Sequence, residues 1–302
     1  MTPAGCETDD SSWERRWGIP QWEPSEMTIC ISAICEAGRA TINVGDDEVG
    51  MGFTATELGR TKWDDLCDGW IVGFAGPVSN AWEVIEWTRK FSPEMTSTHV
   101  LDLRALLEKS YRHARLERVE SELLSSRGWT LQEFKDSGRQ KMPDATYATI
   151  DARLALFDFG AELIASGWAD ESEGNASVIT IKNPGVCIDH SRLGFWCIGS
   201  GATAAQMSLF SRNYSPDMNL EEALYYVIEA KIAAEKASGV GGRIDTFIEW
   251  KEGKSAPLSE DENNSIRAIY ASLKQRDLTS AQRDLIGKIE RIQQFKKREK
   301  SS

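Results

Sequence analysis

Four features that together could carry out nucleophilic chemistry follow one another in the first part of the chain. Thr28 carries a hydroxyl group, an acidic turn occupies 45–47, Lys62 stands alone before an apolar run, and a Gly-Phe-Ala-Gly segment ends at Gly76. A threonine hydroxyl is a poor nucleophile unless a base takes its proton, and a threonine with a free backbone amine carries that base with it. The pattern therefore predicts nucleophilic chemistry at Thr28, on the condition that Thr28 becomes the first residue.

Other interpretations of these residues stay open in the sequence. The acidic turn offers both Asp46 and Asp47, and the spacing favours Asp46. Cys30 lies two positions along the same expected strand, would point to the same face as Thr28, and is a rival nucleophile. Thr28 and Lys62 could also be an ordinary strand residue and a solvated edge charge. The three histidines fit neither a metal spacing nor a catalytic triad, and nothing calls for a metal or an organic cofactor.

The elements that must position these residues are strands followed by helices, in a repeated order. β-Branched runs broken at glycines predict an antiparallel meander from Thr28 to Gly76. Apolar spacing of three and four residues after Pro77 predicts a helix over 78–87. Similar patterns predict helices over 101–124, 202–210, 220–237, 264–273 and 279–295, and strands over 152–164, 177–181, 194–198 and 245–250. This order predicts an α+β fold, a four-layer αββα sandwich of two packed sheets covered by helices.

The chain length of 302 residues allows one large domain with appendages. We expect a leader or flexible N-terminal extension over 1–27, because this stretch is polar and acidic. The sandwich domain would then occupy 28–254, with an insertion at 129–147 where helical signals are weak. A helical C-terminal extension would occupy 255–302.

Charge and cysteine content limit the classes of partner and compartment. The formal net charge of −12 argues against nucleic-acid binding and against affinity for an anionic membrane. No run approaches the roughly 18 apolar residues of a membrane span. The six cysteines show no paired or metal-type spacing, which favours a reducing compartment and a cytoplasmic location.

The segment from Thr28 to about Trp250 resembles the proteasome beta subunits and their bacterial relatives, including the ancestral beta-subunit homologue, among the N-terminal-nucleophile (Ntn) hydrolases. The steps from Asp46 to Lys62 and from Lys62 to Gly76 match that family, and the step from Thr28 to Asp46 is longer by a couple of residues. Ile-Gly-Ser-Gly over 198–201 and Met-Asn-Leu-Glu-Glu-Ala over 218–223 are similar to the family's run between its two later helices.

The resemblance also implies a role for each matching residue. Thr28 would be the nucleophile, with its own amine as the base. Asp46 and Lys62 would be its electrostatic supports, Gly76 would donate an oxyanion-hole amide, and Ser200 would hydrogen-bond the nucleophile's amine.

Two further positions are candidate supporting residues. The family shows an acid and a hydroxyl before a late Gly-rich turn, and Glu235 and Ser238 could fill those places. The register could instead fall on Val-Gly-Gly at 240–242.

The function implied by the resemblance is that of a threonine-type amide hydrolase, in the first place a peptidase, working through an acyl-enzyme ester. The alternatives are a non-catalytic assembly subunit of the same fold and an Ntn amidase acting on a small metabolite. The family implies a homo-oligomer, as a ring or an open helical stack, while an ATPase partner cannot be predicted. Translation starting at Met27, or cleavage of Met27, would make Thr28 the first residue.

Overall fold

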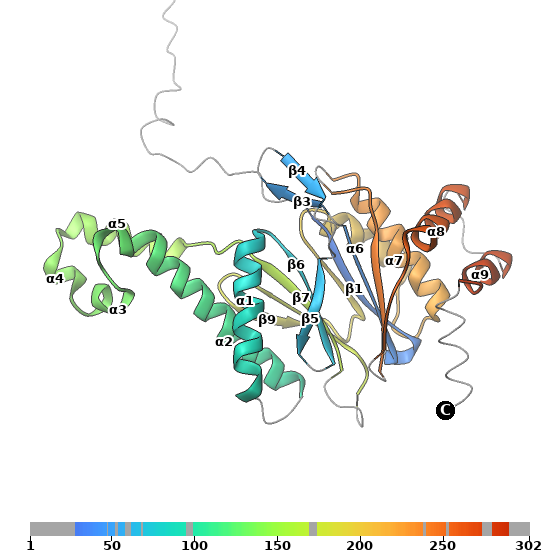
Figure 1. Ribbon diagram of the computed structural model, residues 1–302, viewed down its shortest axis with the longest axis horizontal. Helices are drawn as coiled ribbons and strands as arrows, with labels where there is room; N and C mark the ends of the chain where they lie inside the picture. Colours follow the sequence, from blue (N-terminus) through green and yellow to red (C-terminus); the bar gives the residue numbers. More distant parts are fainter. Residues whose placement is uncertain are drawn as a thin grey trace, which may run out of the picture.

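The computed structural model describes residues 28–46, 48–51, 54–57, 62–67, 69–94, 99–168, 174–237, 240–251, 254–273 and 280–289. The described strands form two five-stranded antiparallel sheets and a separate hairpin (Figure 1). The first sheet has the order β10 (Phe195–Ile198), β1 (Cys30–Cys35), β2 (Ala40–Gly45), β11 (Asp245–Trp250) and β12 (Lys254–Pro257). The second has the order β5 (Trp63–Cys67), β6 (Trp70–Ala75), β7 (Glu162–Gly167), β8 (Ser177–Lys182) and β9 (Val186–Asp189). The hairpin consists of β3 (Glu48–Met51) and β4 (Thr54–Glu57).

The two sheets pack face to face, and β1 shows why its sequence allows this. Side chains alternate between the faces of a strand. Ile31 and Ala33 face a helix layer, whereas Cys30 and Ile34 face the second sheet, where Trp63 and other apolar side chains meet them. Every residue of β1 is buried, and apart from Ser32 its side chains are apolar or cysteine on both faces.

Helices cover the outer face of each sheet, which gives the α+β, four-layer arrangement expected from the sequence. The first sheet packs against α6 (Ala202–Ser211), α7 (Leu220–Ala234), α8 (Glu260–Leu273) and α9 (Ser280–Ile286). The second packs against α1 (Val78–Phe91) and α2 (Val100–Val119). Each helix layer and the space between the sheets has its own cluster of buried apolar side chains.

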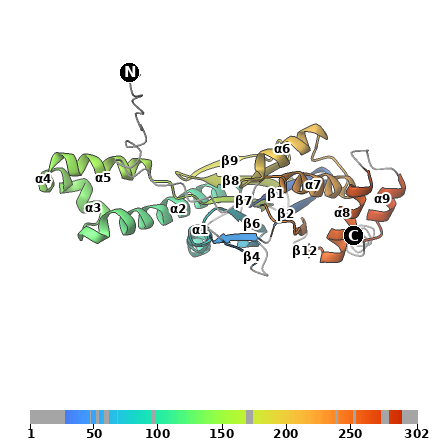
Figure 2. The same ribbon diagram turned by 90° about the horizontal axis from the view of Figure 1, so that it is seen from above.

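A helical arm projects from the end of α2 and corrects one sequence prediction (Figures 1 and 2). It contains the π-helical turns Glu120–Leu124 and Phe134–Gly138 and the helices α3 (Leu131–Glu133), α4 (Arg139–Lys141) and α5 (Asp144–Leu156). The strand expected over 152–164 starts too early, because α5 continues to Leu156 and the strand β7 begins only at Glu162. Ile150 of α5 is held by a small core with Leu124 and Phe134, a tertiary contact that favours helix there.

The described part of the C-terminal segment, 254–273 and 280–289, belongs to the packed structure. β12 pairs with β11 along the edge of the first sheet. Ile266 and Leu273 of α8, and Ile286 of α9, are buried in the same cluster as the side chains of α7. The tail is therefore attached to the layer that lies behind β1 and β2.

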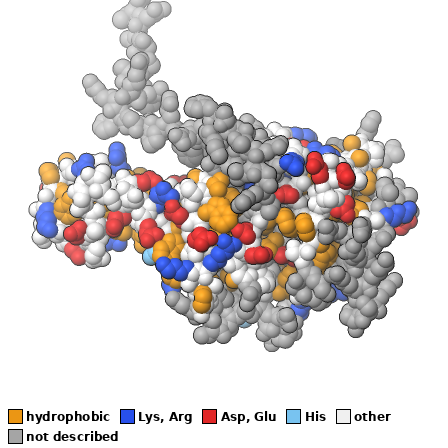
Figure 3. Space-filling model, viewed as in Figure 1, with side chains coloured by type: hydrophobic (Ala, Val, Ile, Leu, Met, Phe, Trp, Pro, Cys, Tyr) orange, Lys and Arg blue, Asp and Glu red, His pale blue; other side chains and the backbone are white. Residues whose placement is uncertain are grey.

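The charged side chains on the surface are mixed in sign. On the face shown in Figure 3, acidic and basic side chains are interspersed, and lysine and arginine do not gather into one large patch. Among the helices that the structure describes, none is both long and apolar enough to cross a membrane.

Candidate active site

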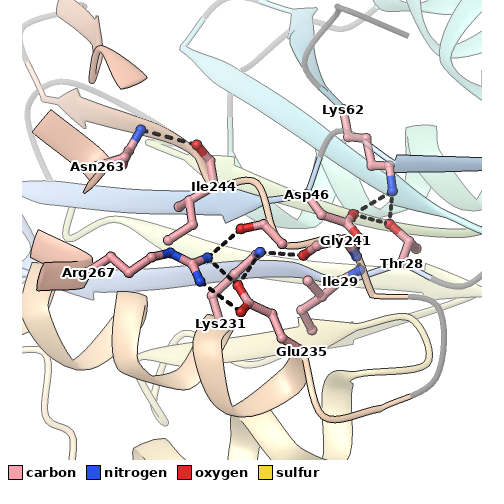
Figure 4. A network of polar contacts seen from close by, with 11 residues as sticks. Thr28, Ile29, Asp46, Lys62, Lys231, Glu235, Gly241, Ile244, Asn263 and Arg267 are labelled. Atoms are coloured by element: carbon pink, nitrogen blue, oxygen red, sulfur yellow. Dashed lines mark hydrogen bonds and ion pairs between the residues drawn. The ribbon is translucent and has the colours of Figure 1, made fainter. Parts of the chain in front are cut away.

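Thr28, Asp46 and Lys62 meet in a cluster at one end of the sandwich (Figure 4). The Thr28 hydroxyl donates a hydrogen bond to Asp46 Oδ1 at 2.7 Å. The Lys62 ammonium donates to Asp46 Oδ1 at 2.5 Å and also to Thr28 Oγ1. All three residues are buried, with 3%, 0% and 4% of their surface exposed. The hydroxyl oxygen therefore lies directly beside a positive charge, in a place where water screens that charge poorly.

The β1–β2 hairpin brings Thr28 and Asp46 together. Cys30 pairs with Gly45 in the antiparallel register, so the residue that follows β2 lies beside the residues that precede β1. The Asp46 amide donates to the Ile29 carbonyl at 3.3 Å, and the Ile29 amide lies 3.4 Å from Asp46 Oδ1. The carboxylate is thus fixed to the backbone of the segment that carries the hydroxyl.

Lys62 reaches this cluster from the second sheet. It comes directly before β5, whose first residue, Trp63, is buried between the sheets. The Trp63 indole nitrogen lies so close to Gly45 that a Cβ there would sit 3.2 Å away. A glycine beside Asp46 therefore leaves room for the indole that places Lys62.

The turn after β10 holds the backbone of Thr28. The Thr28 amide nitrogen donates to Ser200 Oγ at 3.2 Å, and the Gly201 amide donates to the Thr28 carbonyl at 3.3 Å. Gly199 has φ of +93°, and a Cβ on it would lie 2.3 Å from the Thr28 carbonyl oxygen. Only glycine fits at position 199 without displacing the Thr28 carbonyl. The Gly-Ser-Gly segment at 199–201 thus packs directly against Thr28.

Gly76 lies at the same end of the sandwich but belongs to the second sheet. It directly follows β6, two residues before α1 begins, and its φ is +89°. A Cβ there would lie 2.2 Å from the Gly160 carbonyl oxygen, which explains the glycine. The Cys30 thiol donates to the Phe74 carbonyl at 3.3 Å, so the last residues of β6 face the first residues of β1.

Of the two candidate supporting residues, the structure describes only Glu235, which binds other residues than Thr28. Glu235 accepts hydrogen bonds from Lys231 at 2.6 Å and from Arg267, so it belongs to a neighbouring network. Ser238, and Asp47 of the acidic turn, lie outside the described residues. The glycine turn does contribute, because the Gly241 amide donates to Asp46 Oδ2 at 3.0 Å.

Lys231 is the residue that sequence reasoning missed. It lies in a mostly apolar stretch of α7 and is fully buried, which is uncommon for lysine. A lysine within the apolar stretch of the helix predicted over 220–237 is the sequence signal that could have identified it.

Cys30 is a poor nucleophile in this environment. It is completely buried, and this burial raises the pKa of its thiol to about 12, although the nearby Lys62 charge opposes the shift. A thiol with such a pKa stays neutral at physiological pH, and the thiolate is the reactive form. The histidines are also elsewhere, because His99 caps α2, His113 contacts Trp87 and His190 contacts Thr180.

Of the comparisons with known proteins, the one with solved structures supports the fold. No family model matches the sequence, and no curated protein matches it either. Among solved structures, the chain is similar to the Gly-1 mutant of Anbu from Hyphomicrobium sp. strain MC1, with a TM-score of 0.57 and 16% sequence identity. The match covers 82% of this chain and 96% of that chain. Anbu is a bacterial proteasome-like homologue, so the chain shares a proteasome-like fold, while its activity is a separate question.

Proposed function

We propose that the protein is a threonine-type amide hydrolase, in the first place a peptidase, with Thr28 as its nucleophile. One observation carries the proposal: the Thr28 hydroxyl is held between the Asp46 carboxylate and the Lys62 ammonium. A hydroxyl on an ordinary buried strand needs one hydrogen-bond partner, not a buried ion pair that itself has to be desolvated. Such a pair at a hydroxyl is typical of a site with a chemical task.

The first step would be attack of Thr28 Oγ1 on the carbonyl carbon of an amide. The hydroxyl proton passes to the free amine of Thr28, and the Lys62 charge favours the deprotonated oxygen. The C–N bond of the substrate then breaks, its nitrogen leaves with a proton, and an ester to Thr28 remains. Water attacks this ester and gives a proton to the amine. The ester C–O bond then breaks, the amine returns the proton to Thr28 Oγ1, and the carboxylic acid is released.

Gly76 is our candidate for the oxyanion-hole donor. It lies at the same end of the sandwich as Thr28, and α1 begins two residues later. A backbone amide at a helix start presents both a donor and a positive dipole end to an oxyanion. Removing one such donor costs about 3–4 kcal/mol of transition-state stabilisation in other hydrolases.

Exposure of the Thr28 amine is the condition for all of these steps. In the full chain this nitrogen is bonded to Met27 and donates to Ser200 Oγ. We propose that translation starting at Met27, or cleavage of Met27, releases it. Ser200 would then hydrogen-bond the amine and orient its lone pair toward the hydroxyl.

The substrate and the assembly are part of the same proposal. A peptide is the first substrate class to test, by analogy with the proteasome-like neighbour, and a small amide is the second. We further propose a homo-oligomer, as a ring or an open helical stack, that presents this site to its substrate.

The experiment starts with the N-terminus of the purified protein. N-terminal sequencing and intact mass identify the form that begins at Thr28, and size-exclusion chromatography reports its assembly. Hydrolysis is then measured with fluorogenic peptides and with small amides. Thr28→Ala should abolish turnover, whereas the matched variant Cys30→Ala should retain it. Turnover by a form in which residues 1–27 remain attached would refute the amine as the base.

A further inference from the structure

The mechanism above does not use Lys231, although this residue carries a charge deep in the molecule. Its side chain has no exposed surface and projects from the last turn of α7. Burial lowers the pKa of Lys231, while its hydrogen bond to Glu235 opposes that shift. A buried ammonium costs several kcal/mol of desolvation unless its donors find good partners.

The partners of Lys231 connect α7 to the glycine turn and to α8 (Figure 4). Its ammonium donates to Glu235 Oε1 and to the Gly241 carbonyl, both at 2.6 Å. Arg267 of α8 donates to Glu235 Oε2 at 2.9 Å and to the Gly242 carbonyl. Glu235 therefore has a second cation, and the contact that only Lys231 makes is the one with Gly241.

Gly241 is the link between this network and the candidate active site. Its carbonyl faces Lys231, and its amide donates to Asp46 Oδ2 at 3.0 Å. Two of the three residues at 240–242 are glycines, and a Cβ on Gly242 would meet nothing within 4 Å. Side-chain packing of the turn is thus limited to Val240, which lies against Gly201. The two glycines of the turn are therefore held by polar contacts of their carbonyl groups with Lys231 and Arg267.

We propose that Lys231 is a positioning residue for the nucleophile: by binding the Gly241 carbonyl it fixes the backbone of this turn, so that the Gly241 amide, in the preceding peptide unit, stays bonded to Asp46 Oδ2. The other oxygen, Oδ1, is then aligned on the Thr28 hydroxyl and the Lys62 ammonium. This inference rests on the proposed function, because it gives a role to α7 and to the C-terminal α8 in that same site. Arg267 of the C-terminal helix α8 donates to the Gly242 carbonyl, so this helix also helps to position the turn that contacts Asp46.

A purely structural role for Lys231 explains less. Replacing a buried ion pair by apolar side chains is often neutral or stabilising, so such a pair is weak grounds for stability. Glu235 would also keep Arg267 if Lys231 were absent. A positioning role accounts for the remaining contact, the one with the Gly241 carbonyl.

The test compares Lys231→Met with a control variant that removes another cation bound to a carboxylate of α7. Arg212→Met removes a cation that pairs with Glu229 of α7 at 2.7 Å, in a contact that does not involve Asp46. Hydrogen exchange followed by mass spectrometry, on peptides that contain 240–242, reports whether the Gly241 amide is still protected. We expect faster exchange there in Lys231→Met and wild-type exchange in Arg212→Met.

The kinetic arm measures hydrolysis by the form with a free Thr28 amine. Loss of one hydrogen bond to the buried carboxylate should lower kcat roughly 10- to 100-fold. KM should stay unchanged, since the network does not touch substrate, and Arg212→Met should keep the wild-type kcat. A general loss of stability would instead affect both variants alike. If Lys231→Met does not fold, Lys231→Gln is measured instead; its shorter, neutral side chain should weaken the Gly241 contact and change exchange and kcat in the same direction by a smaller amount.

The outcomes are separable. Wild-type exchange at 240–242 in Lys231→Met overturns the inference, whatever the activity. Faster exchange with an unchanged kcat also overturns it, because the turn would then be irrelevant to the nucleophile. A wild-type protein with a free Thr28 amine that hydrolyses no amide refutes the proposed function, and the exchange comparison alone then decides the link between Lys231 and Gly241.

Discussion

Replacing Asp46 by asparagine tests the geometry of the site without any assumption about substrate. Asp46 is completely buried and accepts hydrogen bonds on both oxygens, from the Thr28 hydroxyl and Lys62 on Oδ1 and from the Gly241 amide on Oδ2. Asp46→Asn keeps the shape of the side chain and removes its charge. Lys62, which is only 4% exposed, then keeps a buried ammonium without its counter-ion.

The expected loss follows from these contacts. Removing one member of a buried ion pair costs about 3–5 kcal/mol, because the remaining charge stays desolvated. The asparagine NH2 group must also face either the donors at the Oδ1 position or the Gly241 amide, and one unpaired buried donor costs about 1–3 kcal/mol. These costs overlap, so we expect Asp46→Asn to lower the free energy of unfolding by about 3–5 kcal/mol.

The assay is urea unfolding of the full chain, followed by tryptophan fluorescence and by circular dichroism. Asp64→Asn is the matched control, since Asp64 pairs with Arg89 at 3.0 Å on a partly exposed surface and should change stability by less than about 1 kcal/mol. The double variant Asp46→Asn/Lys62→Met removes both charges and should recover most of the loss. If Asp46→Asn unfolds at the same urea concentration as Asp64→Asn, Lys62 is not a buried partner of Asp46 and the proposed site is wrong.

Three further predictions concern pH and backbone. Burial lowers the pKa of His190 to about 4 from an ordinary 6.5. Between these pH values the unfolded chain binds more protons than the folded chain, so the free energy of unfolding should fall as pH drops from 6.5 to 4. His190→Gln should flatten that decline when it is measured by urea titration. Burial raises the pKa of Glu249 to about 8 from 4.5, with a smaller contribution from Asp65, so the folded chain keeps a proton that the unfolded chain releases and stability should fall as pH rises from 4.5 to 8. Glu249→Gln should therefore melt higher than wild type at pH 8 and like it at pH 4, and equal melting at both values would contradict this. Gly199→Ala should lower the melting temperature more than Gly128→Ala and abolish hydrolysis, because both have positive φ but only Gly199 would drive a Cβ into the Thr28 carbonyl.

The layers of the fold could be predicted from the chain because each element carries its own local signal. The periodicity of apolar residues within each segment was enough to predict most of the helices and several strands: α1, α2, α6, α7, α8, β8, β10 and β11. The strand expected over 152–164 started too early for the opposite reason. Residues near Ile150 pack into the small core of the helical arm, and a local pattern contains no information about such a contact.

The candidate site shows the same division. Thr28, Asp46, Lys62 and the glycine turns were noticed because their spacing resembles a known family, and the structure brings the first three together. The direction of Glu235, toward Lys231 and Arg267 rather than toward Thr28, depends on how α7 packs against α8. Spacing along a chain could not reveal that packing.

The sequence by itself determined which residue types follow one another and which segments bury one face, because helix and strand periods are local properties of the backbone. It thereby determined the αββα class and the order of the chemical groups. Only the tertiary structure decided that a buried lysine of α7 binds the Gly241 carbonyl while the Gly241 amide binds Asp46, a residue 195 positions earlier in the chain. Electrostatic and hydrogen-bond energies depend on distance in space and on burial, and both are set only when the layers pack.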